Sequence, residues 1–339
     1  MKAVRFHEHG GPEVLRYEDA PDPVPKPGEA LVRVRACALN HLDLWQRRGI
    51  DRVRLPMPHI SGADVAGEIV HSTDGEWPPG RRVMLQPGLS CGRCVKCLDG
   101  HDNECAKYDV LGYQSDGGYA ELVKVPIQNL IAIPDAIGFV EAAAFPLTFL
   151  TAWHMLVTRA KLRAGEDVLV LGAGSGVGQA AIQIAWLYGA RVFATAGTDA
   201  KLARARDLGA FEVINHRTED IAGRVRHFTN GRGVDVVVEH VGQATWEQSL
   251  RSLARGGRLV TCGATTGYAG AIDLRFLFSR QYSILGSYMG TKGELLRAAQ
   301  FFFGGQITPA IDSTFPFAAA ADAHRRLEGG EQFGKVVLE

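Results

Sequence analysis

Residues 167–178 read Asp-Val-Leu-Val-Leu-Gly-Ala-Gly-Ser-Gly-Val-Gly, an apolar run that passes into a glycine-rich loop, and a helix-like run follows from Gln179 to Tyr188. A buried strand, a glycine-rich turn and a helix N-terminus, in this order, are typical of dinucleotide binding. Small residues let the backbone approach a pyrophosphate, and the helix N-terminus donates N–H groups to it. The loop departs from the usual G-x-G-x-x-G pattern. The prediction of dinucleotide binding therefore rests on its place between a buried strand and a helix. The residues expected to contact a dinucleotide are Gly172, Gly174, Ser175, Gly176, Val177 and Gly178.

Apolar strand-like runs alternate with helix-like runs throughout the second half of the chain. Strands are expected at 167–171, 191–195, 213–214, 234–239 and 257–262, and helices at 179–188, 199–208, 219–227 and 246–253. Apolar strands that alternate with helices are typical of a parallel sheet with both faces covered. The second half is therefore predicted to be a doubly wound α/β domain of the Rossmann type.

The first half has the pattern of a β-rich domain. Short strands are expected at 1–6, 30–36, 66–71, 82–86 and 119–125. Residues 21–27 read Pro-Asp-Pro-Val-Pro-Lys-Pro, an extended connector that cannot lie inside a sheet. Near the end of the chain, helices are expected around 294–303 and 318–328. The closing run 334–338 is expected to be a strand that returns to the first domain.

Four of the six cysteines lie in one short stretch, at Cys91, Cys94, Cys97 and Cys105. Loops with this C-x2-C-x2-C-x7-C spacing can fold four thiolates round one tetrahedral zinc ion, and a site with four protein ligands has no place for a substrate. We therefore predict a structural zinc. Two disulfides would need an oxidising compartment, and iron–sulfur centres have spacings of their own. The isolated Cys37 and Cys262 are expected to be small buried apolar residues.

The strand after the glycine loop bears on the choice of dinucleotide. A site for NAD usually carries an acid near the end of this strand, which holds the ribose 2′-OH. Here residues 194–198 read Ala-Thr-Ala-Gly-Thr, and the first carboxylate is Asp199. Candidates to surround a 2′-phosphate instead are Thr198, Lys201, Arg204 and Arg217. Lys201 would equally suit the solvated face of a helix, yet we expect NADP(H) to be preferred over NAD(H). His240 follows the strand at 234–239 and is expected to face the cofactor crevice.

Composition excludes several classes of function. Lys and Arg total 37 and so do Asp and Glu, so no basic surplus points to nucleic acid. The longest apolar run, 139–157, is interrupted by Glu141, Pro146 and His154, which indicates a buried helix or a domain connection rather than a membrane span. The first residues form no apolar signal segment, so a cytoplasmic location is expected.

The whole chain resembles the medium-chain dehydrogenase/reductase family. The segments that match it, beside the cysteine stretch and the glycine loop, are Leu39-Asn-His-Leu-Asp43, Gly62-Ala-Asp-Val-Ala-Gly67, Asp116-Gly-Gly-Tyr-Ala-Glu121 and Thr151-Ala-Trp153. The resemblance implies a GroES-like catalytic domain over 1–147 and 289–339 and a Rossmann domain over 148–288. It also implies hydride transfer to or from a small molecule, in a homodimer or homotetramer. The apolar run Ser283–Tyr288 is a candidate edge strand for self-pairing, unless the last helices cover it.

The departures from the family concern its catalytic zinc. Its alcohol dehydrogenases bind this ion with a Cys, the His of a Gly-His-Glu triplet and a further Cys. By resemblance, the three positions are Asn40, Ala63 and Leu147 here, so all three ligands are missing. The pattern is similar to the zinc-free quinone oxidoreductase branch, although most of that branch lacks the cysteine lobe. A displaced metal site built from Cys37, His41 and His59 is the alternative.

Without a Lewis acid, the favoured acceptor is one whose own conjugation spreads the incoming charge, a quinone or an α,β-unsaturated carbonyl. Asn40 is expected to donate its amide to the developing oxyanion, and His41 to relay a proton or contact a cofactor phosphate. Asp43 and Asp64 are expected to orient neighbouring groups, or else to serve as turn and capping residues. Two other functions stay open: a zinc-dependent alcohol dehydrogenase and a non-enzymatic NADPH-binding homologue.

Overall fold

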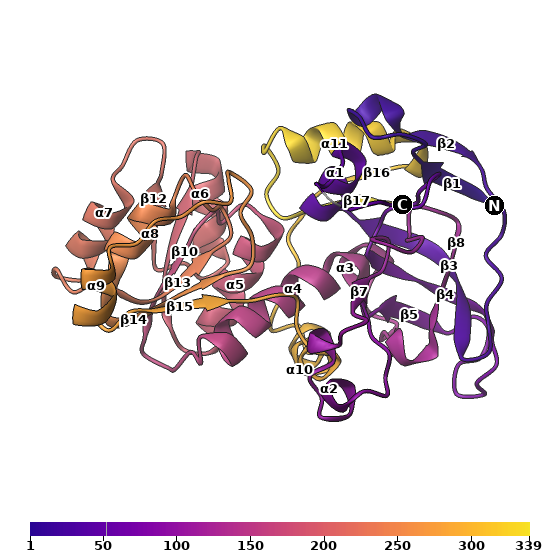
Figure 1. The fold of residues 1–339 in the computed structure, drawn as a ribbon, viewed down its shortest axis with the longest axis horizontal. Coiled ribbons are helices and arrows are strands. Elements are labelled where there is room, and N and C mark those ends of the chain that lie inside the picture. The colour runs from indigo at the N-terminus through magenta and orange to yellow at the C-terminus, as the bar shows by residue number, and fades with distance from the viewer. Residues whose placement is uncertain (52) are drawn as a thin grey trace. The chain divides into compact units, whose positions relative to one another are not determined.

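The computed structural model describes residues 1–51 and 53–339, which form two compact units. The first unit comprises Met1–Leu147 and Thr291–Glu339, and the second comprises Thr148–Gly290 (Figure 1). The chain thus leaves the first unit once and returns to it near its end.

The second unit is built on a parallel sheet with the strand order β12-β11-β10-β13-β14-β15. Its strands are β10 (Asp167–Val170), β11 (Arg191–Ala196), β12 (Glu212–Asn215), β13 (Val234–Glu239), β14 (Leu253–Thr261) and β15 (Ser283–Gly286). Its helices are α5 (Gly176–Leu187), α6 (Asp199–Asp207), α7 (Ile221–Phe228), α8 (Trp246–Ser252) and α9 (Leu274–Ser279), and α4 (Pro146–Trp153) with a π-helical turn (His154–Arg159) precedes them. The order places β10 in the middle and reverses beside it, as in a doubly wound fold.

The central strands explain why this sheet is parallel. All four residues of β10 are buried, and Leu169 and Val237 belong to one apolar core with Phe193 and Leu259. A strand buried on both faces needs an apolar side chain at every position, and β10 has this composition apart from Asp167 at its start. The predicted Rossmann fold is confirmed, and the predicted strands lie within a few residues of the observed ones.

The first unit contains a mixed sheet with the order β16-β17-β3-β4-β5-β9, and β8 also pairs with β3. The strands of the unit are β1 (Lys2–Arg5), β2 (Arg16–Asp19), β3 (Glu29–Ala38), β4 (Asp64–Ser72), β5 (Arg82–Leu85), β6 (Gly88–Leu89), β7 (Asp109–Val110), β8 (Leu122–Pro126), β9 (Leu130–Ala132), β16 (Ile311–Phe315) and β17 (Lys335–Leu338). Strands β1 and β2 pair with each other, and so do β6 and β7, outside the mixed sheet. Its helices are α1 (His41–Arg48), α2 (Val95–Leu98), α3 (Phe139–Ala144), α10 (Lys292–Phe303) and α11 (Ala320–Glu328).

Strand β3 is the centre of this sheet and determines where the polar residues of the unit meet. It pairs antiparallel with β4, with Ala38 opposite Asp64, and with β17, with Val337 opposite Ala38. The prediction that residues 334–338 return to the first domain as a strand is therefore confirmed. This register brings the starts of α1, β4 and β17 together.

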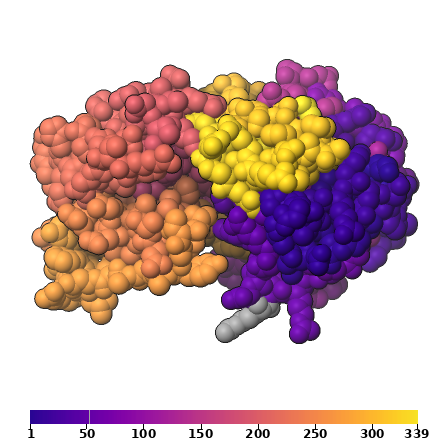
Figure 2. Space-filling view, turned by 90° about the horizontal axis from the view of Figure 1, so that it is seen from above, coloured from indigo at the N-terminus to yellow at the C-terminus, as the bar shows by residue number. Residues whose placement is uncertain are grey.

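The C-terminal segment is also held by helix α11. Figure 2 shows this segment, in yellow, lying against the N-terminal residues in indigo. The buried Arg47 of α1 forms an ion pair with Glu328 of α11, and Arg48 Nη2 lies 2.9 Å from the same carboxylate oxygen. Removing one partner of a buried ion pair is strongly destabilising, so this contact fixes the helix that leads into β17.

In the described part of the chain, no helix combines the length and the apolar composition that a membrane crossing requires. The apolar run 139–157, predicted to be a buried helix or domain connection, is divided among α3, α4 and the π-helical turn.

Candidate functional site

The glycine loop after β10 has little room for side chains. A Cβ on Gly178 would lie 2.2 Å from the carbonyl oxygen of Gly172, and Gly172 itself has a φ of 58°. Ser175 is the N-cap of α5, and its hydroxyl accepts a hydrogen bond from the Gly178 N–H at 2.8 Å. The expected strand–loop–helix arrangement is therefore present: Gly178 is required by the close Gly172 carbonyl, and the loop ends at a helix N-terminus, where a pyrophosphate can bind.

His240 lies against this loop. Its Nε2 atom is 2.7 Å from the Leu171 carbonyl oxygen and 3.4 Å from the Ser175 hydroxyl. A Cβ on Gly172 would lie 3.1 Å from the His240 ring. Burial lowers the pKa of His240, which favours the neutral ring with Nε2–H donating to the carbonyl. His240 thus supports the glycine loop through its contacts with Leu171 and Ser175.

Glu239 fixes the segment that carries His240, and sequence reasoning had assigned it no role. Its buried carboxylate accepts hydrogen bonds from Val241 N at 2.6 Å, Gly242 N at 3.0 Å, Thr245 Oγ1 at 2.8 Å and Ser249 Oγ at 2.6 Å. A buried carboxylate is tolerated when it is fully hydrogen-bonded, and here four donors meet it. The only sequence signal was an acid at the end of an apolar strand.

A group of basic side chains gathers where β11 and β12 end. A Cβ on Gly197 would lie 2.8 Å from Arg217 Nε and 3.0 Å from His216 Nε2. His216 was missed from the sequence because one histidine after a strand carries little signal. Its pKa is lowered, mainly by burial and then by the charges of Arg217 and Lys201. Thr198 is the N-cap of α6 and accepts from Lys201 N at 3.4 Å. Arg204 lies exposed on that helix.

The four candidate catalytic residues of the first unit lie at the start of α1 and of β4. Asn40 is the N-cap of α1, and its Nδ2 atom donates to Asp64 Oδ2 at 2.9 Å. Lys335 Nζ, at the start of β17, donates to Asn40 Oδ1 at 2.7 Å and to Asp64 Oδ2 at 2.9 Å. The structure therefore brings Asn40 and Asp64 together. Lys335 joins them, although no local pattern marked it.

Asp43 is the third polar residue of this cluster. It accepts from Asn40 N at 2.7 Å, from Tyr119 Oη at 3.1 Å and from Gly62 N at 3.3 Å. The first contact closes the N-terminus of α1, so the capping role weighed for Asp43 is present. Burial raises the pKa of Asp43 to about 6, although these hydrogen bonds and Lys335 oppose the rise. His41 is half-buried beside Trp45, at 6.3 Å between ring centroids.

The three positions matched to lost zinc ligands also converge. Leu147 N donates to Asp64 Oδ1 at 2.8 Å, Ala63 precedes Asp64, and Asn40 contacts the other carboxylate oxygen. This arrangement agrees with the correspondence drawn from the sequence, because Asn40 and Leu147, far apart in the chain, contact the carboxylate of the residue that follows Ala63. Cys37 is buried beside Tyr119 and His59 contacts the Gly112 carbonyl oxygen at 3.0 Å.

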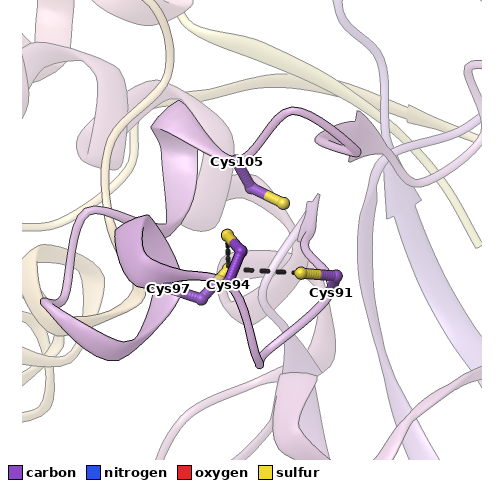
Figure 3. A group of neighbouring side chains, drawn as sticks. All are labelled: Cys91, Cys94, Cys97 and Cys105. Carbon is purple, nitrogen blue, oxygen red and sulfur yellow. Dashed lines mark hydrogen bonds between the residues drawn. The ribbon is translucent and has the colours of Figure 1, made fainter.

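The cysteine lobe lies between β6 and β7, and its four sulfur atoms point toward one another (Figure 3). A tetrahedral zinc ion with bonds of about 2.3 Å holds its sulfurs about 3.8 Å apart. The Sγ–Sγ distances are 3.9 Å for Cys91–Cys97 and 3.5 Å for Cys94–Cys97, and all four sulfurs lie within 4.8 Å of one another. Backbone N–H groups of Arg93 and Cys94 lower the pKa of Cys91 to about 6, whereas a hydrogen bond with the Cys97 thiol raises the pKa of Cys94 to about 11. The lobe fits a structural zinc.

Over residues 1–51 and 53–339, the lobe is the only place where three or more His, Cys, Asp or Glu side chains offer ligand atoms so close together. Cys37, His41 and His59 do not form such a group. The alternative of a displaced metal site therefore finds no support in the arrangement of these side chains.

Comparison with known proteins places the chain in a family. Residues 26–135 match the alcohol dehydrogenase GroES-like domain, and residues 176–304 match the zinc-binding dehydrogenase domain. A quinone oxidoreductase of Pseudomonas aeruginosa is 34% identical over 352 residues, covering 99% of each chain. The human quinone oxidoreductase is 31% identical over 350 residues, covering 100% of this chain and 97% of its own. The crystal structure of an NAD-dependent alcohol dehydrogenase is 48% identical with a TM-score of 0.97, covering 100% of this chain and 99% of its own.

These matches extend over nearly the full length of this chain and of its relatives, and they agree with the fold, the glycine loop and the cysteine lobe described above. The chain belongs to the medium-chain dehydrogenase/reductase family and is an oxidoreductase.

Proposed function

We propose that this oxidoreductase uses NADPH to reduce a quinone or an α,β-unsaturated carbonyl without a catalytic metal. The observation that carries the proposal is which residues occupy the three positions that correspond to the catalytic zinc ligands of the alcohol dehydrogenases. They hold Asn40, Ala63 and Leu147, and Lys335 binds the Asp64 carboxylate that Asn40 and Leu147 contact. An amide, a methyl group and an isobutyl group do not make a ligand set for zinc.

The identity of the acceptor follows from charge. Hydride transfer to a simple ketone places a full negative charge on one oxygen, which a zinc ion stabilises as a Lewis acid. A quinone or enone spreads the same charge over a conjugated system. The oxygen then carries less negative charge, and hydrogen-bond donors can stabilise it without a metal ion. The names of the quinone oxidoreductase relatives agree with this acceptor class.

The choice of NADP(H) rests on the basic group near Gly197. His216 and Arg217 lie beside a glycine, where an acid would otherwise meet a ribose 2′-OH, and Lys201 contributes a further charge. Arg binds phosphate with paired charged hydrogen bonds, which makes Arg217 the principal candidate. The similar alcohol dehydrogenase structure is NAD-dependent, so the cofactor must be tested directly.

Bound NADPH supplies the hydride, and the residues of this chain have the remaining roles. The glycine loop from Gly172 to Gly178 would hold the pyrophosphate, supported by His240. Asn40 would donate to the acceptor oxygen. Asp43, whose pKa burial raises to about 6, can hold a proton at mildly acidic pH, and His41 is the candidate to pass one on. Asp64 accepts from Asn40 and keeps the amide in place.

We also propose that the second unit forms a homodimer through β15. This strand is at the edge of the sheet, and its residue Ile284 is 37% exposed. Phe278 of α9 is 72% exposed and Tyr288 is 59% exposed. An exposed apolar edge invites pairing with a second copy, whereas cover by the last helices would have buried these side chains.

The test combines a metal count with an acceptor screen. Elemental analysis should give about one zinc per chain, and NADPH should be oxidised by quinones and enones but slowly by simple aldehydes. Asn40→Ala should lower turnover roughly 10–100-fold, at the low end for loss of one oxyanion donor, with little change in NADPH affinity. Gln300→Ala, which removes an exposed amide on α10, is the matched control and should leave turnover unchanged.

The second candidate is a zinc-dependent alcohol dehydrogenase, favoured by the name of the structure that is 48% identical. It predicts two zinc ions per chain, oxidation of simple primary alcohols, and loss of that activity with a chelator. It also predicts that Asn40→Ala has no effect on turnover. Observing these results together would refute the metal-free reaction.

A further inference from the structure

Lys335 is a buried lysine with two specific partners. Its side chain is 2% exposed and that of Asp64 is 0% exposed. Its ammonium donates to Asn40 Oδ1 and Asp64 Oδ2, and Asn40 Nδ2 donates to the same Asp64 oxygen. The three side chains therefore close a triangle of hydrogen bonds. A buried ammonium is costly unless it is paired and hydrogen-bonded, and this triangle supplies both conditions.

The triangle determines which way the Asn40 amide faces. An ammonium only donates and a carboxylate only accepts, so the amide oxygen must face Lys335 and the NH₂ group must face Asp64. The reversed amide would place NH₂ against the ammonium and oxygen against the carboxylate. Two charged partners thus favour the same orientation as the capping box of α1, in which the Asn40 side chain accepts from the backbone N–H of Asp43.

One N–H of that amide remains for another acceptor. One Nδ2 hydrogen goes to Asp64, and the nearest further acceptor described is the Ala38 carbonyl oxygen at 3.5 Å, which is too long for a good hydrogen bond. The backbone N–H of Asn40 is already used by Asp43. A cation on the amide oxygen also draws electron density from the nitrogen and strengthens the remaining donor.

We propose that Lys335 is a positioning residue for hydride transfer, which orients and polarises Asn40 so that its remaining N–H donates to the acceptor oxygen. The inference rests on the proposed function, since it needs an acceptor oxygen that receives negative charge. It assigns a role in the reaction to a residue 295 positions away in the sequence from the amide it controls.

A structural role for Lys335 is the competing explanation, because β17 attaches the C-terminal segment to β3. The two roles differ in how substitutions combine. If Lys335 acts through Asn40, Lys335→Met should lower kcat by roughly 10–100-fold, as loss of one oxyanion donor does. Adding Asn40→Ala should then cause little further loss, since groups acting as a unit are not additive. KM and the Kd for NADPH should change less than about threefold.

Two further variants keep the test decisive if Lys335→Met folds poorly. The pair Lys335→Met with Asp64→Asn removes both buried charges together, and it should fold and still show the loss in kcat. Arg326→Met removes a different ion pair of the C-terminal segment, that with Asp312 at 3.0 Å, and should lower stability without changing kcat. If the single losses of Lys335→Met and Asn40→Ala multiply, or if Lys335→Met keeps kcat within twofold, the positioning role is wrong.

A spectroscopic measurement separates this inference from the proposed function. The side-chain amide protons of Asn40, assigned by their disappearance in Asn40→Ala, should shift strongly between wild type and Lys335→Met in ¹H–¹⁵N spectra. If the wild type reduces no quinone or enone, the proposed function fails, and an unshifted amide separately overturns the orientation by Lys335.

Discussion

Cofactor preference gives the sharpest prediction because one exposed side chain is expected to carry most of it. A Cβ added to Gly197 would lie 2.8 Å from Arg217 Nε. Residues 194–198, which surround Gly197 in the sequence, contain no carboxylate, and the first acid is Asp199. A charged hydrogen bond is worth about 1.5–3 kcal/mol, which corresponds to about 10–150-fold in Kd. Arg217→Ala should therefore weaken NADPH binding by this factor. NADH, which has no 2′-phosphate, should bind within about twofold of wild type.

The assay is titration of both cofactors, followed by nicotinamide fluorescence, for wild type and each variant. Arg206→Ala is the matched control, because Arg206 is an exposed arginine on α6 outside the Gly197 group. Gly197→Asp is the converse test, since the φ of Gly197 lies outside the left-handed region and a carboxylate there would pair with His216 and Arg217. Gly197→Asp should weaken the binding of NADPH and leave the binding of NADH unchanged. Equal binding of both cofactors by wild type, or equal weakening of both by Arg217→Ala, would refute the reasoning.

Three further predictions concern the metal, the buried acid and the assembly. Cys97→Ser should release about one zinc per chain and lower the melting temperature, while the rate per folded molecule stays near wild type; full zinc content in elemental analysis would contradict the assigned ligand. Burial raises the pKa of Asp43 from 3.8 to about 6, so the folded state binds a proton that the unfolded state has released. From pH 4 to pH 6, wild type should lose up to about 3 kcal/mol of unfolding free energy relative to Asp43→Asn; urea titrations giving a constant difference would count against it. Ile284→Lys should shift the protein from dimer toward monomer in light scattering, and a wild type that is already monomeric at micromolar concentration would exclude the interface.

Much of the fold could be predicted from the sequence because the signals are local. The strand β10 is a continuous apolar run, and the turn after it needs glycine where Gly178 meets the Gly172 carbonyl. The cysteine lobe is encoded by spacing within one loop. In each case neighbouring residues contain the whole pattern, so no knowledge of the tertiary structure is needed.

The candidate site was predicted only in part because its partners come from distant segments. His216 lies beside Gly197 through the pairing of β11 with β12. Lys335 reaches Asp64 from 271 residues away, and in the sequence it is one charged residue before a short apolar strand. Nothing nearby marks it as buried. Glu239 presents the same difficulty, since its four donors become visible only when the loop after β13 is folded over it.

The charges of the first unit explain why a lysine belongs where the three ligand positions meet. Asp43 and Asp64 are both buried, and a buried carboxylate needs a cation, a proton or several donors. Lys335 supplies one positive charge and contacts Asp64 directly. Asp43 is left with hydrogen bonds and no direct ion pair among the described residues, and its pKa rises to about 6. One lysine, together with hydrogen-bond donors, thus balances two buried carboxylates, where a divalent ion would supply the positive charge alone. On this reasoning, replacing Lys335 with a neutral residue removes a charge that lowers the pKa of Asp43, and this pKa should rise further.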